Sequence, residues 1–154
     1  MEFLLLLTAK DKEILELIYK AGFSAEENTP LCLLGKNFFG FLKKEQKKVV
    51  ICTKNAMEIG GYWIPKSIRD NDYDQTRIYI GRALRHEAVH VAQSCNNGAP
   101  LRMVSVSKLK LHPYKEKALK RSTKVSGNRE KEYEAYLMED RPKLVKNALK
   151  KYCL

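Results

Sequence analysis

Residues 86–90 read HEAVH and bring two histidines and a glutamate into one short segment. On a helix, residues four apart lie one turn apart on the same face, so the imidazoles of His86 and His90 can reach one ion. Zinc binds imidazole nitrogen readily, and a catalytic zinc site combines three protein ligands with one water. The segment therefore predicts that His86 and His90 are zinc ligands and that a third ligand comes from elsewhere in the chain.

Glu87 follows the first histidine, about a quarter turn away, where it can touch the zinc-bound water without binding the metal. The metal lowers the pKa of that water toward neutrality, and the carboxylate accepts its proton. The hydroxide then attacks a peptide carbonyl, and Glu87 passes the proton to the leaving amine. This order of residue types predicts a zinc-dependent metallopeptidase that hydrolyses peptide bonds in a protein or peptide substrate. The opposing interpretation is two surface histidines on an ordinary helix.

The helix expected over about 81–95 has two distinct faces when residues are placed in hundred-degree steps. The polar face carries His86, His90, Gln93 and Asn97. The apolar face, which should pack against a sheet and other helices, carries Leu84, Ala88, Val91 and Cys95. Both expected zinc ligands therefore point away from the core side of their helix.

The third ligand does not follow at the short spacing of the metzincin pattern, because Gln93 and Asn96 stand where that pattern has glycine and histidine. A second helix, expected from about residue 128 to 140, offers Glu130 and Glu134 one turn apart on one face. We favour Glu134. His112 is a rival because it is the third histidine of the chain.

Residues 132–135 read EYEA and resemble the gluzincin clan of metallopeptidases. In that clan the third ligand is a glutamate on a helix beyond the HExxH helix, often before alanine, which implies Glu134. The resemblance covers about Gly60 to Asp140: GGYW at 60–63, RIYI at 77–80 and LRHE at 84–87 are similar to the strand, strand, active-helix order of small zincins. It implies that Ile78 to Ile80 form the sheet edge beside the cleft, where an extended substrate adds as another strand.

Choosing His112 instead makes the chain resemble SprT-like proteases, which act on proteins attached to DNA. Tyr133 or Tyr136 is a candidate for stabilising the oxyanion, as tyrosine or histidine does in related zincins. Glu139 or Asp140 is a candidate for orienting a metal-bound histidine. An alternative to the enzyme is a non-catalytic zincin-fold module of a larger assembly, in which the metal only joins two helices.

The pattern of the whole chain predicts an α+β, zincin-like fold: a small antiparallel or mixed sheet packed on the HExxH helix, with further helices. Expected strands are 49–53, the pair 57–59 and 62–64 around a Gly60-Gly61 turn, 76–80 and, more loosely, 101–111. Expected helices are 8–21, 81–95, 113–121, 128–140 and one from Pro142 to Tyr152, with a short helix open between 24 and 40. We expect one domain over 1–154, with a helical and extended region to about 55, a metal-binding core over 56–140 and a C-terminal helix over 141–154.

The formal net charge is +11, and lysines crowd the segments 108–124 and 143–151. Such a charge favours a polyanion or an acidic partner, while the simpler interpretation is a soluble, solvated surface. Four cysteines without a CxxC pair suggest neither a zinc ribbon nor a redox site. Since no export signal is expected, we predict free thiols in a reducing compartment, while the even number of cysteines also allows two bridges. The apolar run near the start has only five residues after Glu2, so neither membrane insertion nor a signal peptide is expected, and the predicted location is cytoplasmic.

Overall fold

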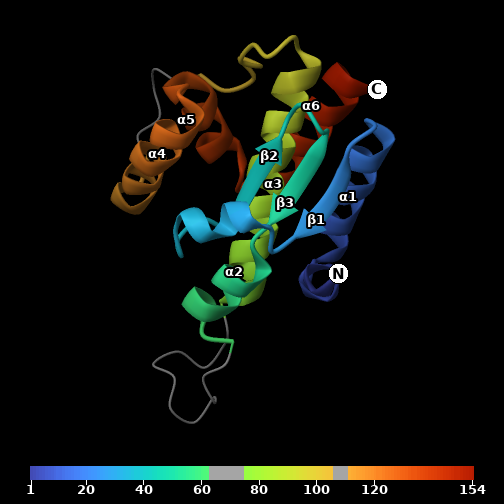
Figure 1. The fold of residues 1–154 in the computed structure, drawn as a ribbon. Coiled ribbons are helices and arrows are strands. Elements are labelled where there is room, and N and C mark those ends of the chain that lie inside the picture. Colours follow the sequence, from blue (N-terminus) through green and yellow to red (C-terminus); the bar gives the residue numbers. More distant parts are fainter. Residues whose placement is uncertain (63–74, 106–110) are drawn as a thin grey trace.

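The computed structural model describes residues 1–62, 75–105 and 111–154, and these residues form an α+β fold (Figure 1). The helices are α1 Ala9–Lys20, α2 Thr53–Gly60, α3 Thr76–Cys95, α4 Pro113–Ser126, α5 Arg129–Met138 and α6 Pro142–Cys153. Two 3₁₀ helices, η1 Glu2–Leu6 and η2 Pro30–Leu34, accompany the strands β1 Ser24–Glu27, β2 Gly40–Lys43 and β3 Lys48–Ile51. The predicted α+β class is confirmed.

The sheet is small and mixed, with β3 in the middle, parallel to β1 and antiparallel to β2. Val49, Val50 and Ile51 of β3 are all fully buried, as the β-branched run at this position predicted. β2 is an edge strand, and no described strand pairs with its outer side. The row of backbone N–H and C=O groups along that side is therefore available for another extended chain.

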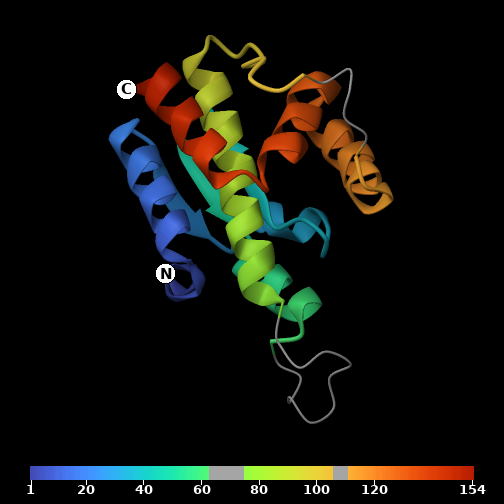
Figure 2. The same cartoon turned by 180° about the vertical axis from the view of Figure 1, so that it is seen from behind.

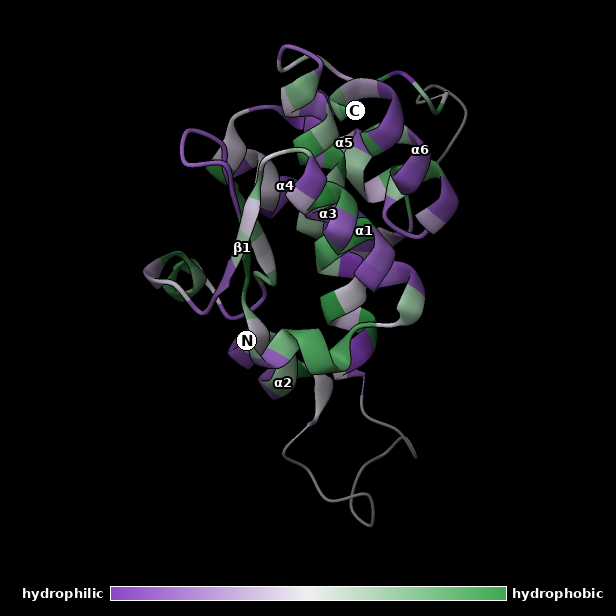
Figure 3. Cartoon of the chain, turned by 90° about the vertical axis from the view of Figure 1, so that its right-hand side faces the viewer, coloured by the Kyte–Doolittle hydropathy of each residue, from purple (hydrophilic) through white to green (hydrophobic). Residues whose placement is uncertain are grey.

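The helices form a second layer against the sheet (Figure 3). The long helix α3 lies behind the strands in Figure 1 and in front of them in Figure 2, with α1 and α6 on one flank and α4 and α5 on the other. A single large apolar core joins these layers and includes Ile14 of α1, Leu84 of α3 and Leu149 of α6. α3 is thus the element that the rest of the fold holds in place.

Local sequence signals place the first helix correctly. Thr8 caps α1 by accepting a hydrogen bond from the backbone N–H of Asp11 at 3.2 Å. Ile14 and Ile18 face the core without any exposure, and Gly22 follows the helix with φ of 85°. The helix predicted over 8–21 is confirmed, and so are the predicted helices that correspond to α4, α5 and α6.

The strand predicted over 76–80 is wrong, because these residues are the first turns of α3. Thr76, Ile80 and Leu84 are fully buried and lie four residues apart, which is the helical period, whereas Ile78 is 42% exposed. The alternation that suggested a strand was too short to separate the two periods. The expected sheet edge at 78–80 is consequently wrong as well, and β2 takes that place beside the cleft.

The hairpin predicted around Gly60-Gly61 is also wrong, because residues 57–59 belong to α2. Gly61 has φ of 81° and ends α2 as a left-handed cap rather than turning a hairpin. Gly60 is needed for close packing, since a Cβ at this position would lie 2.6 Å from the backbone nitrogen of Thr76. The absence of a side chain at Gly60 lets the end of α2 pack directly against the first residue of α3.

Some expectations fall on residues outside the described ranges, namely 63–64 of the expected hairpin and 106–110 of the expected strand over 101–111. Within the latter, residues 101–105 form no strand. In the parts of the chain that the structure does describe, none of the helices combines the length and the apolar character needed to cross a membrane.

The prediction of free thiols is wrong, because all four cysteines form disulfides. Cys32 bonds Cys52 and joins η2 to the end of β3, and Cys95 bonds Cys153 and joins the ends of α3 and α6. Partners 20 and 58 residues apart in sequence give no local signal, so only the fold brings them together. The cytoplasmic location is expected from the absence of an export signal, and it stays a prediction.

A buried ion pair joins α1 to the helix that carries HEAVH. Asp11 is 1% exposed, and its carboxylate accepts a hydrogen bond from Arg85 at 2.6 Å. The absence of a side chain at Gly81 makes room for it, since a Cβ there would lie 2.6 Å from an Asp11 oxygen. Arg85 also donates to the backbone carbonyl of Glu139. The residue directly before His86 is thereby fixed to two neighbouring elements.

Glu27 anchors the N-terminal segment: its carboxylate accepts from the amides of Glu2 and Phe3 and from the hydroxyl of Thr53, the last at 2.6 Å. Burial raises its pKa, but these donors outweigh burial and hold the pKa below its ordinary value. A lowered carboxyl pKa stabilises the fold above the unfolded-state pKa, and this contribution is lost as the pH falls through the folded-state pKa. We therefore expect Glu27→Gln to lower the free energy of unfolding at pH 7 by about 1 kcal/mol, allowing for partial exposure.

The measurement is urea unfolding of wild type and variant between pH 7 and pH 3. The difference between the two proteins should shrink as the pH drops below the model-compound value of 4.5. Glu16→Gln, on the exposed side of α1, is the matched control and should leave stability within about 0.5 kcal/mol of wild type. A difference for Glu27→Gln that stays constant with pH would contradict the role of the ionised carboxylate.

Candidate metal centre

Three ligand-type side chains meet where α5 crosses α3: His86, His90 and Glu132. The two Nε2 atoms of the histidines are 3.2 Å apart. One oxygen of Glu132 lies 3.1 Å from Nε2 of His86, and the other lies 3.2 Å from Nε2 of His90. His86 and Glu132 are 7% and 6% exposed. The structure thus brings together the two predicted histidines and a glutamate of the downstream helix.

The donor set and its spacing fit zinc. Two imidazole nitrogens and one carboxylate are a common catalytic ligand set, and ligands about 2.0 to 2.1 Å from a tetrahedral zinc stand roughly 3.3 Å from one another. The separations of 3.1 to 3.2 Å among these atoms are close to that value. No fourth histidine, cysteine or carboxylate belongs to the group among the described residues, which leaves one position for water.

The outer nitrogens of both histidines are held by acceptors. Nδ1 of His86 lies 2.9 Å from a carboxylate oxygen of Glu139, and Nδ1 of His90 lies 2.7 Å from the side-chain oxygen of Gln93. An acceptor at Nδ1 favours the tautomer that carries its proton there and leaves the Nε2 lone pair facing the metal position. Lys115 in turn binds Glu139 at 3.0 Å. The suggestion that Glu139 orients a histidine is therefore supported by direct contact.

The electrostatics of the group couple the imidazoles to the carboxylates. Burial lowers the pKa of His86, but its hydrogen bonds to Glu132 and Glu139 outweigh burial and raise it well above the ordinary value. Burial raises the pKa of Glu132, yet the two histidines hold it far below the usual range. The carboxylate of Glu132 is therefore ionised at neutral pH, as a metal ligand must be.

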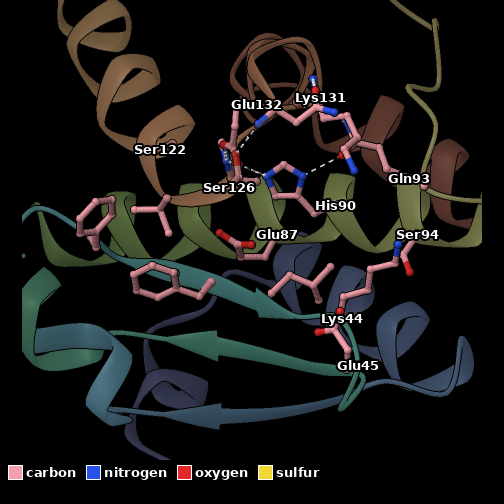
Figure 4. A pocket seen from close by; sticks show the side chains of 18 residues that line it. Lys44, Glu45, Glu87, His90, Gln93, Ser94, Ser122, Ser126, Lys131 and Glu132 are labelled. Atoms are coloured by element: carbon pink, nitrogen blue, oxygen red, sulfur yellow. Dashed lines mark hydrogen bonds and ion pairs between the residues drawn. The ribbon is translucent and has the colours of Figure 1, made fainter. Parts of the chain in front are cut away.

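Glu87 projects from α3 into the cleft and lies against the edge strand (Figure 4). A Cβ at Gly40 of β2 would stand 3.0 Å from Cγ and 3.2 Å from an oxygen of Glu87. The carboxylate has only 5% exposure. Burial raises its pKa, although His90 and His86 oppose the rise. A carboxylate whose pKa is raised toward neutrality is suited to accept and return a proton.

One stripe of α5 faces His86. Glu132, Tyr136 and Glu139 follow one another at helical spacing, and the ring of Tyr136 lies 4.4 Å from the imidazole of His86. The Tyr136 hydroxyl is hydrogen-bonded to Ser122 of α4 at 2.6 Å. Burial raises the pKa of Tyr136, with His86 opposing, so the phenol keeps its proton as a hydrogen-bond donor. The predicted tyrosine therefore lies at the site.

The site opens into a cleft between β2, α3, α4 and α5, with a volume of about 480 Å³ (Figure 4). A smaller pocket of about 130 Å³ adjoins it and is lined in part by aromatic and aliphatic side chains, including Phe39, Tyr79 and Tyr114. Arg82 and Arg121 also line it. The two cavities share the residues Phe38, Gly40, His86, Glu87 and Ser122. His86 and Glu87 thus lie where the larger cleft meets the smaller, more apolar pocket.

A family model described as a domain of unknown function (DUF8637) matches residues 3–154. The chain belongs to this family. No curated protein and no solved structure matches it. The DUF8637 description names no activity, so the function has to be argued from the arrangement of the side chains.

In this DUF8637 chain, Glu134 does not lie with the histidines, although the sequence favoured it as third ligand. Its carboxylate accepts hydrogen bonds from the backbone amides of Leu101 and Arg102, both at 2.8 Å, and from Gln93 at 2.9 Å. Residues 132 and 134 point about 200° apart on a helix, so Glu134 meets α3 at Gln93 and not at the two histidines. Glu134 contacts the histidines only indirectly, because it binds the Gln93 side chain, which in turn contacts His90.

The other candidates lie elsewhere. Tyr133 packs with Leu111 and Leu119 in a small apolar cluster and does not line the cleft. Glu130 is exposed on the first turn of α5. His112 caps α4 by accepting a hydrogen bond from the amide of Tyr114 at 3.3 Å. It is not part of the group formed by His86, His90 and Glu132, the metal group.

Asp140 is an exposed ion-pair partner of Arg82 and Lys115 at the end of α5. It reaches the site indirectly, because Lys115 and Arg82 both also form ion pairs with Glu139. In the basic segments, Lys117, Lys120 and Lys124 are exposed, while Lys108 and Lys110 lie outside the described ranges. Polyanion binding stays a prediction.

Proposed function

We propose that the chain is a small zinc-dependent metallopeptidase with a zincin-like fold. The observation that carries the proposal is the meeting of His86, His90 and Glu132 within 4.8 Å of one another, at a cleft that also holds Glu87. The described architecture supports the zincin-like interpretation, since a glutamate from a later helix completes the group and an antiparallel edge strand lies alongside it. Glu132 replaces Glu134 as the third ligand.

Each residue of the site has a separate role in the proposed reaction. A zinc ion held by His86, His90 and Glu132 supplies a Lewis acid and lowers the pKa of water beside it. Glu87 accepts the proton of the attacking water and returns it to the leaving amine. Tyr136 donates a hydrogen bond toward the oxyanion that forms on the substrate carbonyl. Glu139 and Gln93 hold the two imidazoles in orientation.

The edge strand β2 supports a peptide as the substrate. Its outer backbone groups are not paired with any described strand, and Gly40 places this edge directly against Glu87. An extended peptide that adds to β2 gains main-chain hydrogen bonds whatever its sequence, and its side chains alternate between the cleft and solvent. The apolar pocket beside Phe39 and Tyr79 is suited to one bulky side chain next to the scissile bond.

Metal removal tests the proposal. We expect the purified chain to bind about one zinc per molecule and to cleave unfolded casein or a quenched fluorescent peptide mixture. Dialysis against a chelator should abolish cleavage, and one equivalent of zinc should restore it. Zinc content is measured by atomic emission, and folding of the stripped protein by circular dichroism. Bound zinc without any cleavage would contradict the peptidase and favour the module in which the metal only joins α3 and α5.

A further inference from the structure

The direction of β2 determines how a peptide bound along the cleft is oriented. β2 runs from Gly40, beside Glu87, to Lys43. Antiparallel pairing is slightly more stable per residue than parallel pairing, so a peptide added to the free edge of β2 should run in the opposite sense. Its residues on the amino-terminal side of the scissile bond then lie toward the turn between β2 and β3. Its residues on the carboxy-terminal side lie toward the apolar pocket of Phe39 and Tyr79.

Two lysines line the end of the cleft that receives the amino-terminal side. Lys44 follows β2, and its ammonium lies at the C-terminal end of α3, since a Cβ at Gly98 would stand 3.3 Å from it. Lys131 belongs to α5, and its backbone carbonyl accepts from Gln93 near the same end of α3. Figure 4 shows Lys44 on the strand side of the cleft and Lys131 on the α5 side.

Neither Lys44 nor Lys131 forms an ion pair with any carboxylate in the described parts of the chain. Other lysines of the chain do form such pairs: Lys43 binds the carboxylate of Glu26 at 2.6 Å, and Lys115 binds that of Glu139 at 3.0 Å. Glu45 also lines this end, but it is exposed in the turn and offsets only one of the two charges. The local charge available to a substrate is thus positive.

We propose that this end of the cleft binds an acidic side chain, so that the enzyme prefers peptides with aspartate or glutamate on the amino-terminal side of the scissile bond. The inference rests on the proposed peptidase function and names its substrate class. Two partly exposed charge pairs give a preference of about three- to tenfold for an acidic over a neutral side chain. The net charge of +11 adds long-range attraction for acidic proteins, which weakens with salt.

The test maps cleavage sites in a mixture of peptides from a digested proteome by mass spectrometry. Wild type should show acidic residues enriched within three positions on the amino-terminal side. The K44E/K131E double variant should lose this enrichment or prefer lysine and arginine. The control K20E/K143E changes the net charge by the same amount at exposed sites on α1 and α6, and it should keep the enrichment of acidic residues. No enrichment in wild type, enrichment on the carboxy-terminal side, or equal loss in both variants would overturn the inference.

A binding experiment separates failure of the inference from failure of the proposed function. Zinc-loaded Glu87→Gln protein is titrated with two labelled peptides that differ only in one aspartate or asparagine, and anisotropy is followed. Tighter binding of the aspartate peptide that disappears in the K44E/K131E background supports the acidic site even if wild type cleaves nothing. Equal affinities, or no binding of either peptide, would overturn the acidic site, whether or not wild type hydrolyses peptides.

Discussion

Replacing Glu87 with glutamine is expected to lower kcat/KM for peptide cleavage about a thousandfold while leaving zinc bound. The proposed task of Glu87 is proton transfer, and a positioned general base contributes roughly 10²- to 10⁴-fold. Glutamine has nearly the same shape, so it keeps the contact with Gly40 but cannot accept a proton. The measurement is cleavage of a fluorescent peptide together with zinc content of the same preparation.

Glu45→Gln is the matched control, because Glu45 is an exposed carboxylate at the rim of the same cleft. It should cleave a neutral peptide within about twofold of wild type. A Glu87→Gln protein that keeps zinc and full activity would remove Glu87 from the mechanism. Equal losses in both variants would show that overall charge in the cleft, and not a general base, limits the reaction.

The parts of the fold that the sequence predicted are those decided by local rules. A threonine cap, buried residues at helical spacing and a glycine after the last turn place α1 within about one residue of the prediction. Residues 86–90 are helical, as predicted, and both histidines reach the metal group because the four-residue spacing is enough to stack them. These features depend on neighbours in the sequence and not on the rest of the fold.

The errors arose where local rules allow two outcomes. The alternation of Thr76, Ile78 and Ile80 fits a strand, but the same segment continues a helix whose buried positions are 76, 80 and 84. Gly60-Gly61 fits a hairpin turn as well as a helix cap. Core packing decided between these outcomes, because α3 gains a longer buried face when it begins at Thr76. The cysteine pairings depend on contacts across the fold and had no local signal.

The candidate site, too, could be predicted only in part from local sequence rules. The sequence predicted a glutamate from the later helix, but not which face of that helix turns toward α3. One signal was present: Glu132, Tyr136 and Glu139 share a stripe, and all three contact His86. Two carboxylates and a tyrosine on one stripe of a helix indicate a partner that needs charge. The favoured Glu134 points about 200° away from Glu132 around α5 and binds Gln93 and the backbone amides of Leu101 and Arg102 instead.

Changing Glu132 to glutamine is the second large expected effect, because it removes the only proposed ligand outside the HEAVH segment. An amide is a poor zinc ligand beside two imidazoles, so we expect zinc affinity to fall at least about a hundredfold. Cleavage should be lost when variant and wild type are compared at the same zinc concentration. Affinity is measured by competition with a chromophoric chelator at pH 7. Circular dichroism and urea unfolding of the metal-free protein report whether the variant still folds.

Glu134→Gln distinguishes a ligand from a residue that supports the fold. The amide nitrogen that replaces one oxygen would face the backbone N–H of Leu101 or Arg102, donor against donor. We expect the free energy of unfolding to fall by about 1 to 3 kcal/mol. Zinc affinity should fall by no more than about tenfold, because Glu134 acts only through Gln93 on His90. If Glu134→Gln loses zinc while Glu132→Gln keeps it, the third ligand is Glu134, and the metal group described for α3 and α5 is not the one that binds.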